Sequence, residues 1–190
     1  LVSDLPNSRR DFFIGINSLA AGRTAGSLMG RFVRGEGEIL VVTNSMRARD
    51  SVERRLGFDE VMARDFPGLM VLPSVEAHDD PARMERIVGE VIARREKLKG
   101  VYSMGSGNTT LLAALRASGR AGELVVIAHE LTPATRAALI DGEIDAVIAQ
   151  NVGHLVRSSL RVLRNLCDDL PIYEAQERLR IEVVLRENLP

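Results

Sequence analysis

Short apolar runs alternate along this chain with longer amphipathic segments, and this alternation constrains the fold more than any other feature of the sequence. The runs are rich in β-branched residues and are typical of buried strands, at 12–16, 39–43, 69–73, 100–103, 124–128 and 146–149. The amphipathic segments repeat apolar residues at helical steps, at 18–33, 48–65, 81–97, 109–118, 133–140 and 153–167. Strands that alternate with helices predict an α/β fold, with a parallel sheet covered by helices on both faces.

Local signals mark three helix starts and one further strand. Ser18 is expected to cap the first helix, and a capping residue followed by proline opens two others, at 80–81 and 132–133. From Arg178 to Arg186 apolar and polar residues alternate, which predicts a half-buried strand. The sheet is therefore expected to gain a late strand at one edge.

The bulk composition excludes several classes of protein. Its 25 basic and 26 acidic residues are evenly spread, so this segment lacks the block of positive charge that binding a nucleic-acid backbone requires. The longest apolar runs, such as 39–42 and 124–128, are far shorter than the ~18 residues of a membrane span. The single cysteine, Cys167, excludes an internal disulfide, gives weak support for a reducing compartment and is expected to fill core space.

Polar residues follow five of the six predicted strands. In open parallel sheets, ligands bind beyond the carboxyl ends of the strands, where loops and helix N-termini converge. The residues at these positions are Asn17 and Ser18, Asn44 and Ser45, Gly105 to Asn108 with Ser106 between, His129 and Glu130, and Gln150 and Asn151. Their amides, hydroxyls and carboxylate suit the hydroxyls of a sugar or polyol. Any one of them also fits a turn or a helix cap, so the series carries the prediction.

Two arginines lie in the helix that follows the strand at 39–43. Arg54 and Arg55 are placed so that one guanidinium fork could reach back toward the strand ends and hold two hydroxyl oxygens. Helix periodicity alone favours solvent exposure for both. These two readings stay open at the level of residue pattern.

Other chemistries fit the sequence less well. The glycine turn at 104–110 lacks the third glycine of a dinucleotide motif, and no phosphate-binding GK[ST] follows it. His129 beside Glu130 occupies the place of a general base, but no Ser or Cys nucleophile lies in an elbow motif. His78 and His154 are too scattered to indicate a metal site. An α/β enzyme acting on a sugar or nucleotide therefore ranks below a binding module.

Four segments carry a family resemblance in order and spacing: NSLAAGRTAG at 17–26, ERRLGF at 53–58, HELTP at 129–133 and IDAVIAQN at 144–151. They resemble the effector-binding domain of the LacI/GalR repressors and of their relatives, the ribose-type periplasmic sugar-binding proteins. The resemblance covers nearly the whole chain. It implies a periplasmic-binding-protein-like type I fold of two Rossmann-like lobes, with the first βα units of the N-lobe lacking.

The resemblance also implies roles for single residues. Arg54 would clamp the sugar, Asn108 or Ser106 would supply an amide or hydroxyl, Glu130 would accept hydroxyl hydrogens and Gln150 would lie near the hinge. Glu130 stands where the family usually has aspartate, and aromatic residues make up only 4% of the chain, which leaves few rings to stack on a pyranose. The full predicted ligand-binding set is Arg54, Ser106, Asn108, Glu130, Gln150, Asn17 and Asn44, without catalytic residues, metal or cofactor.

The same resemblance implies a division into lobes and a mechanism. Residues 1–43 with 153–167 would form a partial N-lobe, and residues 44–152 with 168–190 the C-lobe. Ligand would bias closure of the lobes and so change the operator affinity of a cytoplasmic homodimer, whose helix-turn-helix headpieces lie outside this chain. The alternative is the periplasmic sugar-binding protein of an ABC transporter, which predicts a monomer with a signal peptide.

Overall fold

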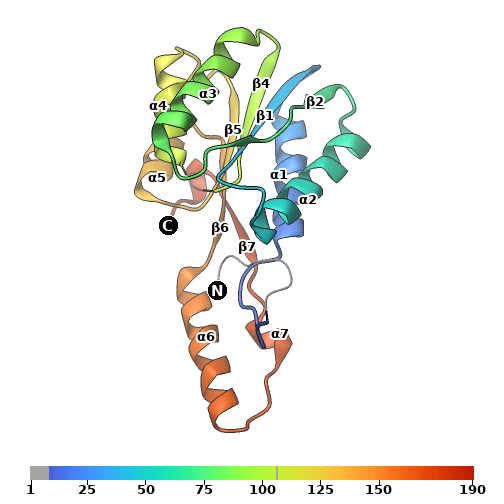
Figure 1. Cartoon of the computed structure of the whole chain (residues 1–190), viewed down its shortest axis with the longest axis vertical. Helices are drawn as coiled ribbons and strands as arrows, with labels where there is room; N and C mark the ends of the chain where they lie inside the picture. Colours follow the sequence, from blue (N-terminus) through green and yellow to red (C-terminus); the bar gives the residue numbers. More distant parts are fainter. Residues whose placement is uncertain (1–8, 106) are drawn as a thin grey trace.

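Helices cover both faces of one seven-stranded sheet in the structure, a computed structural model that describes residues 9–105 and 107–190 (Figure 1). The strands are β1 (Gly37–Thr43), β2 (Leu69–Val71), β3 (Val75–Glu76), β4 (Leu98–Ser103), β5 (Val125–His129), β6 (Ala146–Gln150) and β7 (Ile181–Val184). The helices are α1 (Ser18–Phe32), α2 (Arg49–Asp65), α3 (Pro81–Arg94), α4 (Asn108–Ala117), α5 (Pro133–Ile140), α6 (Val152–Cys167) and α7 (Glu174–Glu177), and a short 3-10 turn spans Arg186–Asn188.

The strand order is β2-β1-β4-β5-β6-β7, and β3 also pairs with β1. Every pairing is parallel except that of β6 with β7, which is antiparallel. The predicted α/β class, five of the six predicted strands and the late edge strand are therefore confirmed. The predicted strand at 12–16 is wrong: these residues are irregular and pair with no strand of the described chain. A β-rich run forms a strand only where a neighbour takes up its backbone hydrogen bonds.

Two apolar cores lie on opposite faces of the sheet. In β1, Leu40 and Val42 point to the face covered by α3, α4 and α5, whereas Ile39 and Val41 point to the face covered by α1 and α2 (Figure 1). Side chains alternate between the faces of a strand, and parallel strands are covered on both sides. This explains why β1 is nearly continuous in apolar residues.

Helices α1 and α2 approach each other so closely that glycine is required at the crossing. A Cβ atom at Gly22 would overlap the carbonyl oxygen of Arg54, and a Cβ at Gly57 would overlap that of Leu19. Each helix therefore presents a glycine to the backbone of the other. This contact holds the start of α2, where Arg54 lies, against the body of the molecule.

After β6 the chain leaves the sheet through α6 and α7 and returns as β7 (Figure 1). Helix α6 buries Leu155 and Val162 against Ile14, Ile16 and Leu179. Beside this buried side, α6 exposes a second apolar stripe made of Val152, Val156, Leu160, Leu163 and Leu166.

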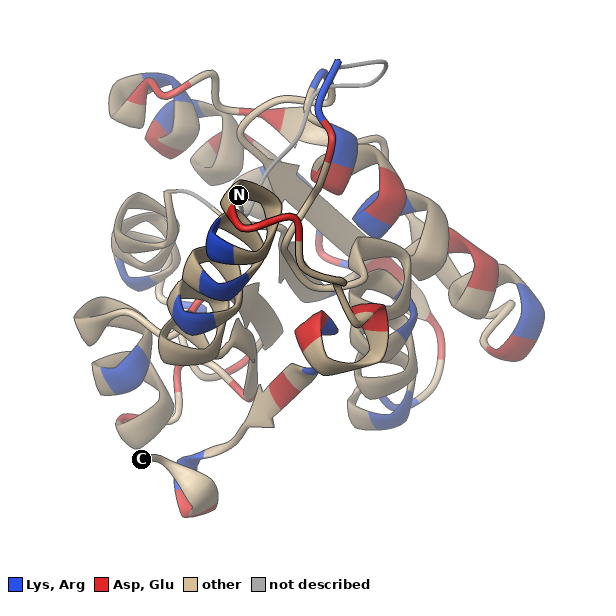
Figure 2. Cartoon of the chain, turned by 90° about the horizontal axis from the view of Figure 1, so that it is seen from below, with Lys and Arg blue, Asp and Glu red and all other residues tan. Residues whose placement is uncertain are grey.

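Acidic and basic residues are interspersed over the molecule as viewed from below (Figure 2). None of the described helices combines the length and apolarity needed to span a bilayer.

Three further expectations need correction. Cys167 is exposed at the end of α6 rather than buried in a core. The first helix is capped by Asn17, whose side chain accepts from the backbone N–H of Ala20, and not by Ser18. Strand β1, assigned from sequence to a partial N-lobe, lies between β2 and β4 in the same sheet as β5 and β6. Its hydrogen bonds to β4 therefore move 37–43 to the body of the molecule.

Candidate functional site

A cavity of about 470 Å³ opens at the carboxyl ends of β1, β4 and β5. Its walls come from the loops after these strands and from the first turns of α2. The lining residues are Thr43, Asn44, Ser45, Ala48, Asp50, Ser51, Arg54, Met104, Gly105, Gly107, Asn108, Thr109, Glu130 and Thr132. The cavity thus lies at the edge of the sheet where the sequence predicted a ligand, and most of the residues that line it have polar side chains.

Arg54 is buried in the wall of this cavity rather than exposed to solvent. Its side chain is 4% exposed, its Nη1 donates to the carbonyl oxygen of Met104 at 2.6 Å, and a carboxylate oxygen of Asp50 lies 3.8 Å away. Its Nε has no hydrogen-bond partner among the described residues. A buried N–H without a partner is costly, so an acceptor that enters the cavity would relieve this cost.

Arg55 has the opposite orientation. Its guanidinium bonds to the Asp59 carboxylate, the Leu72 carbonyl oxygen and the Ser74 hydroxyl, on the side of α2 away from the cavity. Arg55 therefore holds α2 to the loop after β2. The sequence pattern left open whether Arg54 or Arg55 reaches the strand ends. The structure places Arg54 at the cavity.

Glu130 and Gln150 form a pair at the ends of β5 and β6. The Gln150 amide donates to the Glu130 carboxylate at 3.1 Å, and the other amide atom of Gln150, Oε1, is buried without a described partner. Burial raises the pKa of Glu130, while the positive charge of Arg54 and the Gln150 hydrogen bond oppose this rise. The Glu130 carboxylate and the Arg54 guanidinium therefore interact electrostatically across the cavity that both line.

The backbone of Glu130 is also unusual, because its φ of 72° lies in the left-handed region that non-glycine residues seldom adopt. The hydroxyl of Thr135, which is fully buried, donates to the Glu130 carbonyl oxygen at 2.8 Å. The Glu130 N–H donates to the carbonyl oxygen of Ile148 at 3.0 Å. These bonds maintain the turn that directs the carboxylate toward the cavity.

Asn108 lines the cavity but has two partners within the protein. Its Oδ1 accepts from the Ser103 hydroxyl at 2.6 Å, and its Nδ2 donates to the carbonyl oxygen of His129 at 2.8 Å. The side chain therefore ties the end of β4 to the end of β5. Its neighbour Ser106, the other predicted residue of this turn, lies outside the described residues.

The two remaining predicted residues lie on either side of the site. Asn44 lines the cavity, and its Oδ1 accepts from the backbone N–H of Asp79. Asn17 caps α1 and lines a different cavity of about 780 Å³, together with Phe13 and Arg49. Asp50 borders both cavities. The structure thus brings Arg54, Asn108, Glu130, Gln150 and Asn44 together, and places Asn17 next to them.

His129, the possible general base, lies behind the cavity wall. It is fully buried, and its Nε2 is 2.9 Å from the hydroxyl of Tyr102, which stacks on Phe58. Burial lowers the pKa of His129 well below its usual value, with the charge of Arg54 as a second cause. A neutral imidazole shielded by the strand ends is part of the core beneath the site.

Residue pattern alone did not identify Asp50, Ser51 and Thr132 as lining residues. Asp50 had the clearest available signal, because it precedes Arg54 by four residues and so shares its side of α2. Among the described residues, no group of three or more His, Cys, Asp or Glu side chains is placed to hold a metal ion.

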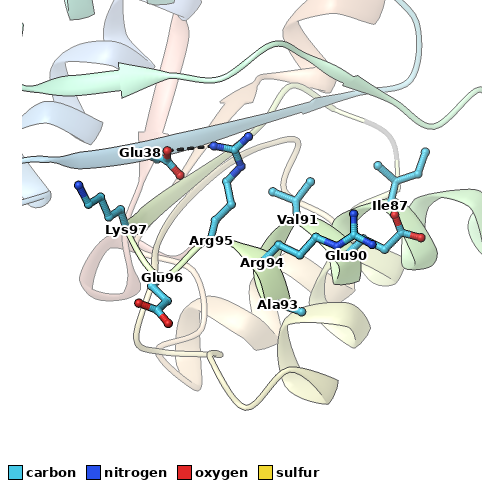
Figure 3. A pocket seen from close by; sticks show the side chains of 9 residues that line it. All are labelled: Glu38, Ile87, Glu90, Val91, Ala93, Arg94, Arg95, Glu96 and Lys97. Carbon is cyan, nitrogen blue, oxygen red and sulfur yellow. Dashed lines mark hydrogen bonds and ion pairs between the residues drawn. The ribbon is translucent and has the colours of Figure 1, made fainter.

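A separate cavity of about 520 Å³ lies beside the end of α3 (Figure 3). Charged side chains of both signs surround it, and Arg95 is paired with Glu38 at 2.9 Å (Figure 3). It borders the start of β1 and the residues before β4, away from the strand ends where Arg54 and Glu130 meet. We therefore assign the ligand site to the cavity at Arg54.

Comparison with known proteins identifies the family of this chain. Residues 1–170 match the model of the Periplasmic binding protein domain, and the chain belongs to this family. Its fold is accordingly the periplasmic-binding-protein-like α/β fold expected from the sequence. No curated protein matches the chain.

Solved structures of sugar-binding proteins resemble this chain. The glucose-galactose binding protein GanP from Geobacillus stearothermophilus is 17% identical, with a TM-score of 0.87 over 98% of this chain and 66% of its own. A solute-binding protein of an ABC transporter from Burkholderia graminis, solved with D-arabinose, is 28% identical with a TM-score of 0.85, over 98% and 65%. A sugar-binding protein from Bacillus halodurans is 26% identical with a TM-score of 0.82, over 96% and 67%. The chain spans about two thirds of the length of these proteins.

The stability contributed by Glu130 is expected to depend on pH. Burial raises the pKa of the Glu130 carboxyl group above its ordinary 4.5. Glu130 therefore stabilises the folded state most below pH 4.5, and this contribution is lost as the pH rises through the raised pKa. We therefore expect Glu130→Gln to unfold at a higher temperature than the wild type at pH 8. Thermal melts followed by circular dichroism should show the difference vanish at pH 4. An equal difference in unfolding temperature at pH 8 and pH 4 would show that burial of the Glu130 charge does not cause the difference.

Proposed function

We propose that this chain is the greater part of the effector-binding domain of a LacI-type transcriptional regulator, which binds a sugar or polyol in the cavity at Arg54. The main support is the state of Arg54 and Gln150, which are buried in or beside the cavity and each keep one polar atom without a described partner. The hydroxyls of a polyol both donate and accept, which is the chemistry that the N–H of the lining residue Arg54 and, behind Glu130, the amide oxygen of Gln150 both require. The structures with D-arabinose and with D-fucose show such ligands in proteins of this fold.

The second lobe of this domain would be built around α6, α7 and residues 9–16. This assignment is supported by the place of α6 away from the sheet and by its exposed apolar stripe. We propose that the remaining part of a two-lobed domain covers this stripe. The structurally similar sugar-binding proteins contain such additional chain, because the match covers only 66% and 65% of two of them. Ligand held between the lobes would favour their closed arrangement.

In the intact regulator, closure would change the geometry of a homodimer and with it the affinity of its DNA-binding headpieces for the operator. Resemblance of the 17–26 segment to the cytoplasmic repressors favours this reading. The second candidate is a periplasmic carrier of an ABC transporter, which the proteins from Burkholderia graminis and Bacillus halodurans favour. Both candidates are binding proteins with the same ligand site.

Calorimetric titration of the intact protein with a panel of aldoses, ketoses and polyols tests the shared part of the proposal. We expect micromolar binding of at least one compound, and its loss in Glu130→Ala. Fluorescence anisotropy with DNA from upstream of the gene then separates the two candidates, because only a regulator binds DNA and changes its affinity when the sugar is added. A panel without binding would refute the sugar site, and sugar binding without DNA binding would favour the carrier.

A further inference from the structure

Arg54 has a second carboxylate beside it that the predicted ligand set does not include. Asp50 lies one helical turn earlier on α2, and its carboxylate oxygen is 3.8 Å from Nη1 of Arg54. The side chain of Asp50 is 17% exposed, so the pair is largely withdrawn from water. Asp50 also raises the pKa of Glu130 across the cavity, after the larger effect of burial. The three charges therefore act on one another.

We propose that Asp50 sets the charge selectivity of the cavity, making Arg54 a donor to neutral hydroxyls and excluding sugars that carry a carboxylate or phosphate. The inference rests on the proposed sugar-binding function and specifies its ligand class. An arginine fork without a counter-charge is suited to binding carboxylates and phosphates. Here the counter-charge is already supplied by the protein.

The geometry of the pair supports this role. At 3.8 Å, Asp50 is close enough to offset the charge of Arg54 but beyond hydrogen-bond distance, so it does not take up the donors of the guanidinium. Nη1 bonds to Met104, and Nε has no described partner. A ligand oxygen can therefore accept from Arg54, while the positive charge that would attract an anion is offset.

The charge balance of the whole cavity points the same way. Among its described lining residues, Asp50 and Glu130 are the acidic groups and Arg54 is the basic one. An anionic group placed against Arg54 would lie near two carboxylates in a partly buried site, where repulsion is stronger than in water. A neutral hydroxyl in the same place would not be repelled.

Matched pairs of sugars test the proposal: D-galactose with D-galacturonate, and D-glucose with D-glucuronate. Each pair shares one ring and differs by a carboxylate at C6. Calorimetry on the intact protein measures the ratio of the two Kd values within each pair for the wild type, Asp50→Asn and a control, Glu53→Gln. Glu53 lies on the same helix, pairs with Arg49 and does not line this cavity, so the control removes a nearby charge of the same sign.

We expect the wild type to favour the neutral sugar of a pair at least ~100-fold, and Asp50→Asn to reduce that ratio at least ~10-fold, with Glu53→Gln unchanged. The ratio cancels any general loss of affinity in the variant, and thermal melts confirm that it folds. Asp50→Ser, which also removes the charge, should give the same change if Asp50→Asn is unstable.

The possible failures are distinguishable. A wild type that binds uronates as tightly as neutral sugars, or a ratio that Asp50→Asn and Asp50→Ser leave unchanged, would overturn the role of Asp50 and leave the sugar site standing. A shift of equal size in Glu53→Gln would show a general effect of net charge instead. A wild type that binds neither these sugars nor any in the wider panel would refute the proposed function, and the inference with it.

Discussion

Arg54→Ala is expected to weaken sugar binding by the intact protein at least ~100-fold, because truncating one member of a buried, charged hydrogen-bond network commonly costs about 3 kcal/mol. The change removes the donor to Met104 and the Nε without a described partner, and it removes the positive charge that lies 3.8 Å from the largely buried Asp50 carboxylate. The unfolding temperature should fall as well. Calorimetry with the sugar found in the panel measures the first effect, and circular dichroism the second.

The neighbouring arginine provides the control for this experiment. Arg55→Ala removes hydrogen bonds to Asp59, Leu72 and Ser74 but no group that lines the cavity, so it should lower stability and leave the Kd within about 2-fold. Arg54→Lys keeps the charge but lacks the planar fork, and we expect it to recover only part of the affinity. Equal losses of affinity in Arg54→Ala and Arg55→Ala would contradict the assignment of Arg54 to the site.

Gly57→Ala is expected to destabilise the folded protein by about 3 kcal/mol, although alanine is the better helix former. The added methyl group would overlap the carbonyl oxygen of Leu19, so α1 and α2 would have to separate. Gly22→Ala should act from the other helix, since its methyl group would overlap the carbonyl oxygen of Arg54 itself. Urea unfolding measures both changes, and ligand titration should show weaker binding because α2 carries Arg54.

Gly89→Ala is the matched control on another helix. Apart from its chain neighbours and the backbone of its own helix, no described atom lies within 4 Å of the place that a Cβ would take at this position in α3. The same substitution should therefore be neutral or stabilise the protein by up to about 1 kcal/mol through helix propensity. If Gly57→Ala and Gly89→Ala had the same effect, close packing at the α1–α2 crossing would not be the reason for glycine there.

The sequence allowed much of the sheet to be predicted, because its central strands are buried on both faces and contain continuous apolar runs. Residues 12–16 are also apolar but lack a strand neighbour in the described chain, which local pattern cannot reveal. Cys167 ends α6, a helix whose apolar residues extend beyond its buried side. The residue type alone therefore predicted burial where the cysteine is exposed. Both errors concern contacts between distant parts of the chain.

The sequence allowed the positions of most candidate residues to be predicted, but not the contacts that each side chain makes. The strand-end rule placed Asn44, Asn108 and Glu130 at one edge because parallel strands end together. It could not show that the amide of Asn108 bonds to Ser103 and His129, since these partners are set by the approach of β4 to β5. Nor could helix periodicity show that Arg54 is buried, because its side chain is covered by parts of the chain that are distant in sequence, including the loop at Met104.

The antiparallel pairing of β6 with β7 has a mechanical consequence. Gln150, where the chain leaves the sheet, faces Ile181, where it returns, so both ends of the intervening segment join the sheet through one two-stranded ribbon. Residues 9–16 pack against α6 and lead into α1, which gives a second connection to the body. Torque applied at the far end of α6 therefore reaches the sheet as torsion of the ribbon and reaches α1 through residues 9–16. In this ribbon, β6 ends at Gln150, whose amide donates to the Glu130 carboxylate. Rotation of the outer segment would therefore act directly on this hydrogen bond at the cavity.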